Sequence, residues 1–341
     1  MYKKTDGRQR KMKTSFIAKL IVILCFICLA AGFVSMEKYK PYADDYIKGK
    51  SNKAAVIELN GIIAAGSESG FFENSASASS MLKSLAAAKD DNDISGIILK
   101  INSPGGTAAM SQSIYNKILD IRSKKPVVTV FEDVGASGAY YIASACDRII
   151  AQEGSLTGSI GVIFSFMDYH SLLSDKLNIN NVVIKSGKFK DIGSGTRAMT
   201  DEEHALMQEI INDSYSQFLK DIKKGRIQRT DKYTAKKSEL SEKTLKLYAD
   251  GRIFTGRQAE KLGFIDETGG MDTAKAMIEK MMNEKNKNQL PAVLIAYNKQ
   301  NSFIDYLTGA AEYRFNGGSI KLTDIIPKSA VLNKRLLYLW E

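Results

Sequence analysis

Short apolar runs alternate with helical stretches between residues 54 and 187, and this alternation limits the fold more than any other feature of the chain. The apolar runs cover 54–61, 94–101, 126–131, 147–152, 159–166 and 180–187. Helical patterns fall between them at 107–123, 137–146 and 168–177. Apolar strands separated by helices are typical of βαβ units, in which helices cover both faces of a parallel sheet. The sequence therefore predicts an α/β fold with a mostly parallel sheet and flanking helices.

The pattern becomes helical after residue 200. Thr200 and Glu203 form a capping box at the start of a long amphipathic stretch. Thr255 and Gln258 form a second box, which begins a short helix that ends at Gly263. Residues 271–286 predict one more amphipathic helix. No internal repeat and no second domain is evident, so we expect one folded domain over 54–290, followed by a C-terminal extension at 291–341.

A basic segment followed by an apolar one opens the chain. Residues 1–15 form a basic tail, and residues 16–36 reach the roughly 20 apolar residues that a membrane-spanning helix needs. The basic flank predicts that the N-terminus is cytoplasmic and that the rest of the chain lies outside. A cleaved secretory signal is the alternative, with Ala30–Gly32 as a weak cleavage site, and we favour a retained anchor. Residues 37–53 then read as a polar stalk.

Charge and cysteine usage narrow the class of protein. The formal net charge is +10. Residues 1–19 carry seven basic residues and one acidic residue, which leaves +4 on the rest of the chain. This is an ordinary surface rather than a nucleic-acid-binding one. Cys25 and Cys28 lie in the apolar segment and Cys146 stands alone, so no disulfide framework is expected. No Cys, His or acidic cluster has metal-ligand spacing, and we expect neither a metal nor another cofactor.

Two segments are candidates for chemistry at strand ends. GASGAYYIASA (135–145) places Ser137 after a small turn and before a helix. Ser137 is either a nucleophile, with the Gly138 N–H aimed at developing negative charge, or a simple helix N-cap. INSPGG (101–106) follows an apolar strand, at the sheet edge where ligands bind in α/β folds. It is either part of an oxyanion hole or a plain strand-to-helix turn.

A nucleophilic serine needs a base, and the usual histidine is not an obvious choice here. His170 and His204 are the two histidines, and both fall at expected surface helix starts. SGKFKDIGSG (186–195) offers two lysines instead. They are either solvated or partly buried, and burial would lower a lysine pKa from about 10.4 toward neutrality. The polar turn TGS (157–159) offers a hydroxyl that can hold such an amine.

Five segments, taken in order, resemble the signal peptide peptidase A-type serine proteases of peptidase family S49, in the short single-anchor form of Gram-positive bacteria. They are INSPGG (101–106), GASGAYYIASACDRIIA (135–151), LTGSIGVI (156–163), SGKFKDIGS (186–194) and DGRIFTGRQAEKLGFIDETGG (250–270). The match covers roughly residues 54–285. The resemblance implies a Clp protease/crotonase-like fold and a serine protease domain over 54–290.

The resemblance also implies a serine–lysine dyad. Matching motif to motif, the nucleophile falls on Ser137 and the general base on Lys190, the second lysine of GKFKD. Ser159 takes the role of positioning the lysine amine. The chain departs from the family pattern at Ala139, where members often have glycine, and this small change leaves the serine unaffected.

The remaining implications concern the oxyanion hole, the substrate and the assembly. The backbone donors map to Gly106, with Gly105 as the second choice, and to Gly138. Members of the family cleave remnant signal peptides and other apolar peptides at the outer face of the cytoplasmic membrane. They form a dome-like homo-oligomeric ring, octameric in the short form, whose catalytic residues can come from neighbouring subunits. The sequence thus predicts a single-pass membrane serine endopeptidase with an extracytoplasmic catalytic domain. A crotonase-like acyl-CoA enzyme and a non-catalytic membrane scaffold are the alternatives.

Overall fold

The structure is a computed structural model that describes residues 51–65, 78–228, 233, 239–297 and 337–339. The predicted tail at 1–15 and the predicted membrane helix at 16–36 lie outside the described residues, as do most of the stalk and most of the C-terminal extension. Among the helices that are described, none combines the length and the apolar character that crossing a bilayer requires.

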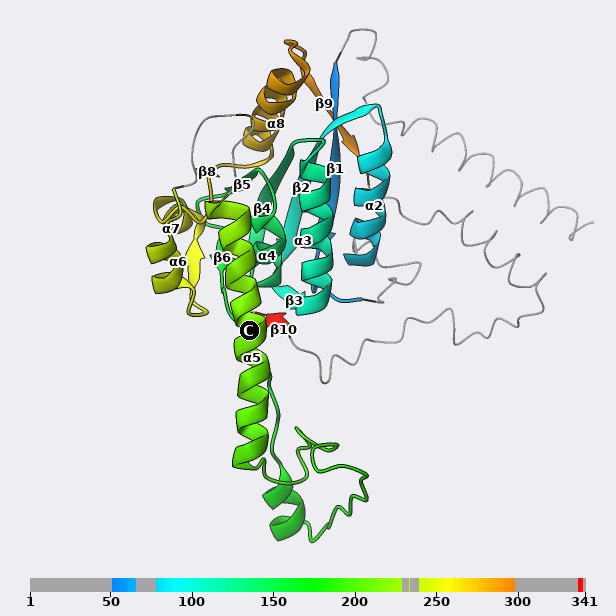
Figure 1. Cartoon of the computed structure of the whole chain (residues 1–341), viewed down its shortest axis with the longest axis vertical. Helices are drawn as coiled ribbons and strands as arrows, with labels where there is room; N and C mark the ends of the chain where they lie inside the picture. Colours follow the sequence, from blue (N-terminus) through cyan, green and yellow to red (C-terminus); the bar gives the residue numbers. More distant parts are fainter. Residues whose placement is uncertain (1–50, 66–77, 229–232, 234–238, 298–336, 340–341) are drawn as a thin grey trace, which may run out of the picture. The chain divides into compact units, whose positions relative to one another are not determined.

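Within the described part of the chain, eight strands form the central sheet (Figure 1). The main path runs β7-β6-β4-β2-β1-β9, and β5 pairs with both β4 and β8. Every pair is parallel except β6 with β7, which confirms the expected mostly parallel sheet. The strands are β1 (Asn52–Asn60), β2 (Ile94–Ser103), β4 (Val127–Ala136), β5 (Arg148–Ala151), β6 (Leu156–Gly158), β7 (Ile253–Thr255), β8 (Glu267–Thr268) and β9 (Ala292–Ala296).

Helices cover the two faces of this sheet (Figure 1). The larger core lies under α2 (Ala78–Asp90), α3 (Ala108–Arg122), α4 (Gly138–Ser144) and the C-terminal end of α5 (Asp201–Ile222). The smaller core lies under α8 (Met271–Asn286) on the opposite face. The remaining elements are β3 (Gly105–Thr107) paired with β10 (Leu337–Leu339), the short helices α6 (Glu242–Tyr248) and α7 (Gly256–Lys261), and the π-helical turns Leu172–Lys176 and Lys223–Ile227.

The apolar run of β2 shows how the sequence produces these two cores. Side chains of successive strand residues point to opposite faces. Accordingly, Ile97 and Leu99 belong to the larger core and Ile98 to the smaller one, and all three are fully buried. A strand that is buried on both faces must be apolar at nearly every position, which explains the continuous apolar run.

The structure differs from the sequence prediction beyond β6. Residues 159–166 and 180–187 were predicted as strands, yet neither forms a regular strand. The expected helix at 168–177 is reduced to a short helical segment at 170–176. Both apolar runs have the composition of strands, but a strand needs a pairing neighbour along its length. In the described structure the two runs contain a single bridge residue, Ile163. At the other end of the sheet, β9 pairs in parallel with β1, so the sheet continues past residue 290.

Both predicted capping boxes are confirmed. Thr200 accepts a hydrogen bond from the Glu203 N–H, and the Glu203 side chain accepts one from the Thr200 N–H, at the start of α5. Thr255 and Gln258 make the same reciprocal pair at the start of α7. Each box satisfies two N–H groups that would otherwise lack an intrahelical acceptor.

Candidate active site

Ser137 occupies the sharp turn between β4 and α4. Its φ of 54° and ψ of −117° place it where side chains with a Cβ rarely lie, at a cost of about 1–3 kcal/mol. The side chain is fully buried, and among the described residues the Oγ has no hydrogen-bond partner. Ser137 stands at the N-cap position of α4, yet its hydroxyl caps no backbone N–H. The helix-cap interpretation is therefore wrong.

Backbone contacts fix this turn from both sides. The Ser137 N–H donates to the Gly158 carbonyl at 2.8 Å, and the Ser137 carbonyl accepts from the Tyr141 N–H at 2.9 Å. Gly138 lies in the first turn of α4, so its N–H has no acceptor within the helix. This free donor lies directly beside the serine, as an oxyanion site requires.

The glycine pair after β2 lies against the start of α4, because β3 packs on that helix. Gly105 has a φ of 110°, and its N–H donates to the Ser103 Oγ at 3.1 Å. A Cβ on Gly106 would lie 2.0 Å from the Ile63 carbonyl oxygen, so only glycine fits there. The Gly105 N–H thus has an acceptor in Ser103, and Gly106 lies opposite Tyr338 of β10, so the choice between the two candidate donors stays open.

Ser159 follows β6 and enters the site beside Ser137. It is 6% exposed, and its N–H donates to the Arg252 carbonyl at 2.8 Å. Ser159 has a φ of 48° and follows Gly158, whose φ is 87°. Gly158 is the residue whose carbonyl accepts from the Ser137 N–H, so the two serines lie on directly bonded segments.

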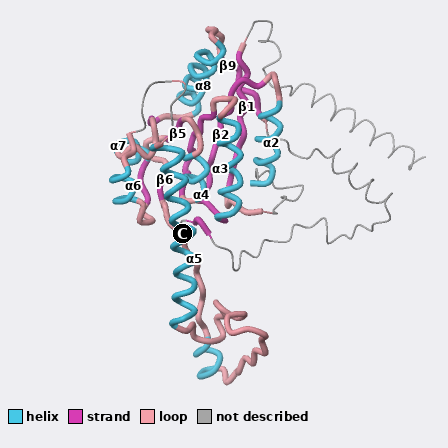
Figure 2. Tube along the Cα trace, viewed as in Figure 1, coloured by secondary structure: helices cyan, strands magenta, loops and turns pink. Residues whose placement is uncertain are grey.

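Lys190 lies elsewhere, on a segment that we call the arm (residues 161–200). No residue of the arm is buried, and Lys190 itself is exposed. Figure 2 shows that the arm is mostly loop, and Figure 1 shows that it runs alongside the first half of α5. Ion pairs between Arg197 and Glu203 and between Lys188 and Glu202 join the arm to the first turn of that helix.

The length of α5 separates the lysine from the serine within one chain. The C-terminal end of α5 packs on the serine's helix, where Asp221 accepts a hydrogen bond from the Tyr141 hydroxyl. The arm is joined to the other end, at Glu203. At 1.5 Å per residue, the helix from Glu203 to Asp221 spans about 27 Å. The structure therefore brings Ser137, Gly138, the β3 glycines and Ser159 together, and it does not bring Lys190 to them.

Comparisons with known proteins give the family. Residues 120–287 match the model of peptidase family S49, and residues 60–152 match the Clp protease model. A putative protease of Synechocystis is 38% identical over 65% of this chain and 72% of its own length. The chain belongs to peptidase family S49. Its fold is the Clp protease-like α/β fold with a mostly parallel sheet.

Two other relatives of this S49 chain carry related names. A putative protease of Methanocaldococcus jannaschii is 40% identical over 58% of this chain and 59% of its own length. A putative signal peptide peptidase SppA of Enterococcus faecium is 34% identical over 68% of this chain and 65% of its own length. The chain thus spans 59 to 72% of the lengths of these three relatives.

The edge of β3 accepts an extended segment in this S49 chain. β10 pairs with β3 in antiparallel register, with Tyr338 opposite Gly106 and Leu339 opposite Gly105 (Figure 1). On its other side, β3 is bridged to Ile63, which donates to the Gly105 carbonyl and accepts from the Thr107 N–H. The edge of β3 that β10 occupies is therefore able to pair with an extended chain beside the candidate oxyanion donors.

Sequence reasoning missed two contacts that shape the site. Ser103 accepts from the Gly105 N–H, and its place two residues before the glycine pair was the available signal. Tyr141 and Asp221 join α4 to α5, but they are 80 residues apart in sequence. No local pattern predicts such a pair.

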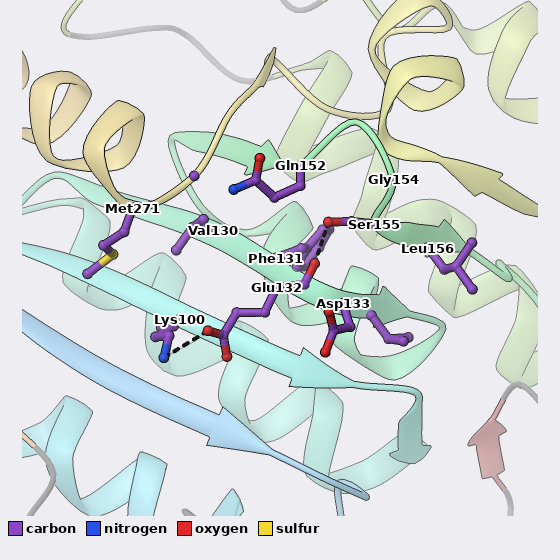
Figure 3. A pocket seen from close by; sticks show the side chains of 12 residues that line it. Lys100, Val130, Phe131, Glu132, Asp133, Gln152, Gly154, Ser155, Leu156 and Met271 are labelled. Atoms are coloured by element: carbon purple, nitrogen blue, oxygen red, sulfur yellow. Dashed lines mark hydrogen bonds and ion pairs between the residues drawn. The ribbon is translucent and has the colours of Figure 1, made fainter.

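A pocket of about 750 Å³ lies on the sheet, and none of the predicted site residues lines it (Figure 3). It includes Lys100 on β2 and Glu132 on β4, whose side chains are 2.8 Å apart. The hydrogen bond that Lys100 donates to Glu132 raises the pKa of Lys100 despite partial desolvation, so Lys100 stays charged and is not suited to act as a base. Among the described residues, no group of three or more His, Cys, Asp or Glu side chains is placed to hold a metal ion.

Proposed function

We propose that this member of family S49 is a membrane-anchored serine endopeptidase with Ser137 as nucleophile and Lys190 as general base. The observation that carries the proposal is the strained, buried Ser137 hydroxyl without a partner, next to the Gly138 N–H and the β3 glycines. A buried hydroxyl that bonds to nothing lowers stability, and such groups are retained where they serve chemistry.

The chemistry follows from these groups. The neutral Lys190 amine removes the proton from the Ser137 Oγ as the oxygen attacks a peptide carbonyl. The N–H groups of Gly106 and Gly138 stabilise the resulting oxyanion. The Lys190 ammonium then protonates the departing amine, and water hydrolyses the acyl-enzyme by the same proton relay. Ser159 accepts a hydrogen bond from the amine and holds it in line with the nucleophile.

Lys190 reaches Ser137 from a neighbouring subunit in this proposal. Two features support it: the Ser137 hydroxyl has no partner among the described residues of its own chain, and the arm carries Lys190 at the far end of α5. The arm also exposes large apolar side chains to solvent, including Met167, Val182 and Ile184, which are 79%, 83% and 97% exposed. A second copy would cover them, in a homo-oligomeric ring that is octameric by resemblance.

Apolar peptides left in the membrane after export, including remnant signal peptides, are the proposed substrates. An extended peptide would take the place of β10 on the edge of β3 and pass its scissile carbonyl beside Ser137. The predicted helix at 16–36 would anchor the ring to the cytoplasmic membrane, with the catalytic domain on the outer face.

Mixing two inactive variants tests the proposal. Ser137→Ala and Lys190→Ala should each reduce peptide cleavage by at least about a thousandfold while the chain remains folded. Co-assembly of equal amounts should restore about a quarter of wild-type activity, because one site in four then pairs an intact serine with an intact neighbouring lysine. Full activity of Lys190→Ala would refute the dyad. Inactive single variants without recovery on mixing would refute the sharing of sites between subunits.

A further inference from the structure

Lys190 lies in a turn that is positioned by its neighbours. Backbone hydrogen bonds join the Lys190 N–H to the Gly187 carbonyl at 3.1 Å and the Ser194 N–H to the Asp191 carbonyl at 3.0 Å. The Lys190 side chain is exposed, and it forms no ion pair with any described residue. The position of the Lys190 amine therefore depends on the contacts that hold the turn.

Arg197 binds the residue next to the lysine with two donors. Its Nε donates to the Asp191 Oδ2 at 2.9 Å, and its Nη2 donates to the Asp191 Oδ1 at 2.8 Å. The Lys185 Nζ donates to the same Oδ1 at 2.5 Å. Both carboxylate oxygens of Asp191 are thus occupied, and the side chain is only 11% exposed. A two-donor contact of this kind fixes orientation as well as distance.

The same guanidinium binds α5. The Arg197 Nη1 donates to the Glu203 Oε2 at 2.8 Å, and Nη2 contacts the other oxygen of that carboxylate. Glu203 is 3% exposed and is held by the capping box, in which its Oε2 accepts from the Thr200 N–H at 3.0 Å. Arg197 therefore connects the lysine turn to the first turn of a 22-residue helix.

Most carboxylates around the lysine turn are paired with a lysine or an arginine. Hydrogen bonds from Arg197 and Lys185 hold the pKa of Asp191 well below its usual range. Arg197 also lowers the pKa of Glu203 to about 2. A carboxylate without such partners would stabilise the Lys190 ammonium and oppose the neutral amine that a base needs. The charged and titratable groups of this turn and of the first turn of α5 are Lys185, Lys188, Asp191, Arg197, Asp201, Glu202, Glu203 and His204.

We propose that Arg197 is a positioning residue for Lys190. Its guanidinium holds the base-bearing turn against α5. It also pairs with the Asp191 carboxylate, which follows the base in the sequence. The inference rests on the proposed function, because it assigns a role to Arg197 only if Lys190 is the base. Arg197 itself touches no reacting atom.

The main test compares Arg197→Gln with the wild type in the full-length protein. We expect kcat to fall about tenfold with KM unchanged within twofold, because a misplaced base slows proton transfer rather than peptide binding. We also expect the acidic limb of the kcat/KM profile to move to higher pH by about 0.5–1 unit, because the substitution leaves Lys185 alone to offset the Asp191 carboxylate, which then favours the Lys190 ammonium.

A second substitution separates this electrostatic role from a purely structural one. Adding Asp191→Asn to Arg197→Gln removes this carboxylate, so the acidic limb should return to its wild-type position while kcat remains low. A shift that Asp191→Asn does not reverse would overturn the proposal. Arg197→Lys serves if Arg197→Gln fails to assemble: it keeps the charge but loses the two-donor contact. We expect it to lower kcat severalfold with no shift of the acidic limb, and wild-type kcat would overturn the proposal.

Arg257→Gln is the matched control, because the Arg257 Nε and Nη2 also contact a carboxylate, that of Glu153, at an exposed site on α7. Equal kcat values and pH profiles for Arg197→Gln and Arg257→Gln would overturn the positioning role. Lys190→Ala belongs in the same series. If it is active, the proposed dyad itself fails. If it is inactive while Arg197→Gln behaves as the control, only the positioning role fails.

Discussion

Ser137 lies among residues that are all buried, whereas Lys190 lies on an arm in which no residue is buried. Every residue of α4 is buried, and β4 and β6 hold the serine turn through backbone hydrogen bonds. In the described structure, ion pairs of Lys188 and Arg197 join the arm to α5, and Val162 at its beginning packs against the larger core. The packing of one chain thus holds the serine part of the proposed site in place. The arm, which carries the proposed lysine, exposes apolar side chains to solvent.

The difference between the buried serine region and the exposed arm should have its largest effect on the assembly of subunits. In a single chain Ile184 is 97% exposed, so Ile184→Asp should leave folding of the chain unchanged. If a neighbouring subunit covers the arm, the carboxylate would be buried without a partner at a cost of several kcal/mol. We expect the assembly to dissociate and peptide cleavage to fall at least tenfold. Light scattering in detergent and a peptidase assay measure the two effects.

Leu247→Asp is the control for this substitution. Leu247 lies on α6, away from the arm, and is 59% exposed. Its replacement should leave both mass and activity unchanged, because a charge at an isolated exposed site needs no partner. An intact, active assembly of Ile184→Asp would show that the arm does not pack against another copy.

The same contrast separates what the sequence could predict from what it could not. The turn at Ser137, the glycines of β3 and both capping boxes follow from local patterns and from strands that the core buries on both faces. The runs at 159–166 and 180–187 have strand composition, but in the described structure Ile163 is the single residue of the two that forms a β-bridge. The Tyr141–Asp221 contact joins distant segments, so it depends on tertiary packing. Local patterns predict the elements whose apolar side chains pack into the core of the chain. They do not predict the structure of the arm, in which no residue is buried.

The stability of two serine variants tests whether the buried Ser137 hydroxyl lacks a partner, and the expected effect is smaller. The Ser137 hydroxyl is buried and bonds to nothing among the described residues, whereas the Ser144 hydroxyl, also buried and on the same helix, donates to the Tyr141 carbonyl at 2.7 Å. Ser137→Ala should therefore stabilise the chain by about 1 kcal/mol, because it removes a desolvated polar group. Ser144→Ala should destabilise it by about 0.5–1.5 kcal/mol, because it removes a hydrogen bond.

Chemical denaturation of the two serine variants in parallel measures this difference. Each substitution removes one buried oxygen from a site with no exposed surface, so loss of volume affects both alike. The sign of the stability change is the decisive quantity. A destabilised Ser137→Ala would mean that the hydroxyl makes a favourable contact, either within its own chain or with Lys190 of a neighbouring subunit. Repeating the measurement in the Ile184→Asp background separates the two, because a contact that persists in the dissociated chain would remove the main structural support for the nucleophile.

Acidic pH should loosen the arm before it affects the serine half. The pKa of Glu203 is about 2 in the folded chain and about 4.3 when unpaired, and the pKa of Asp191 is lowered in the same direction. Carboxylates with lowered pKa values contribute stability above the unfolded pKa and lose it as pH falls toward the folded one. The contacts of Arg197 should therefore be complete above about pH 4.5 and weaken between pH 4.5 and 2. The backbone bonds of Ser137 contain no titrating group. Hydrogen-exchange protection factors should thus fall with pH in residues 186–204 while those of β2 and β4 persist, and equal loss in both regions would mean that the arm and the sheet unfold together.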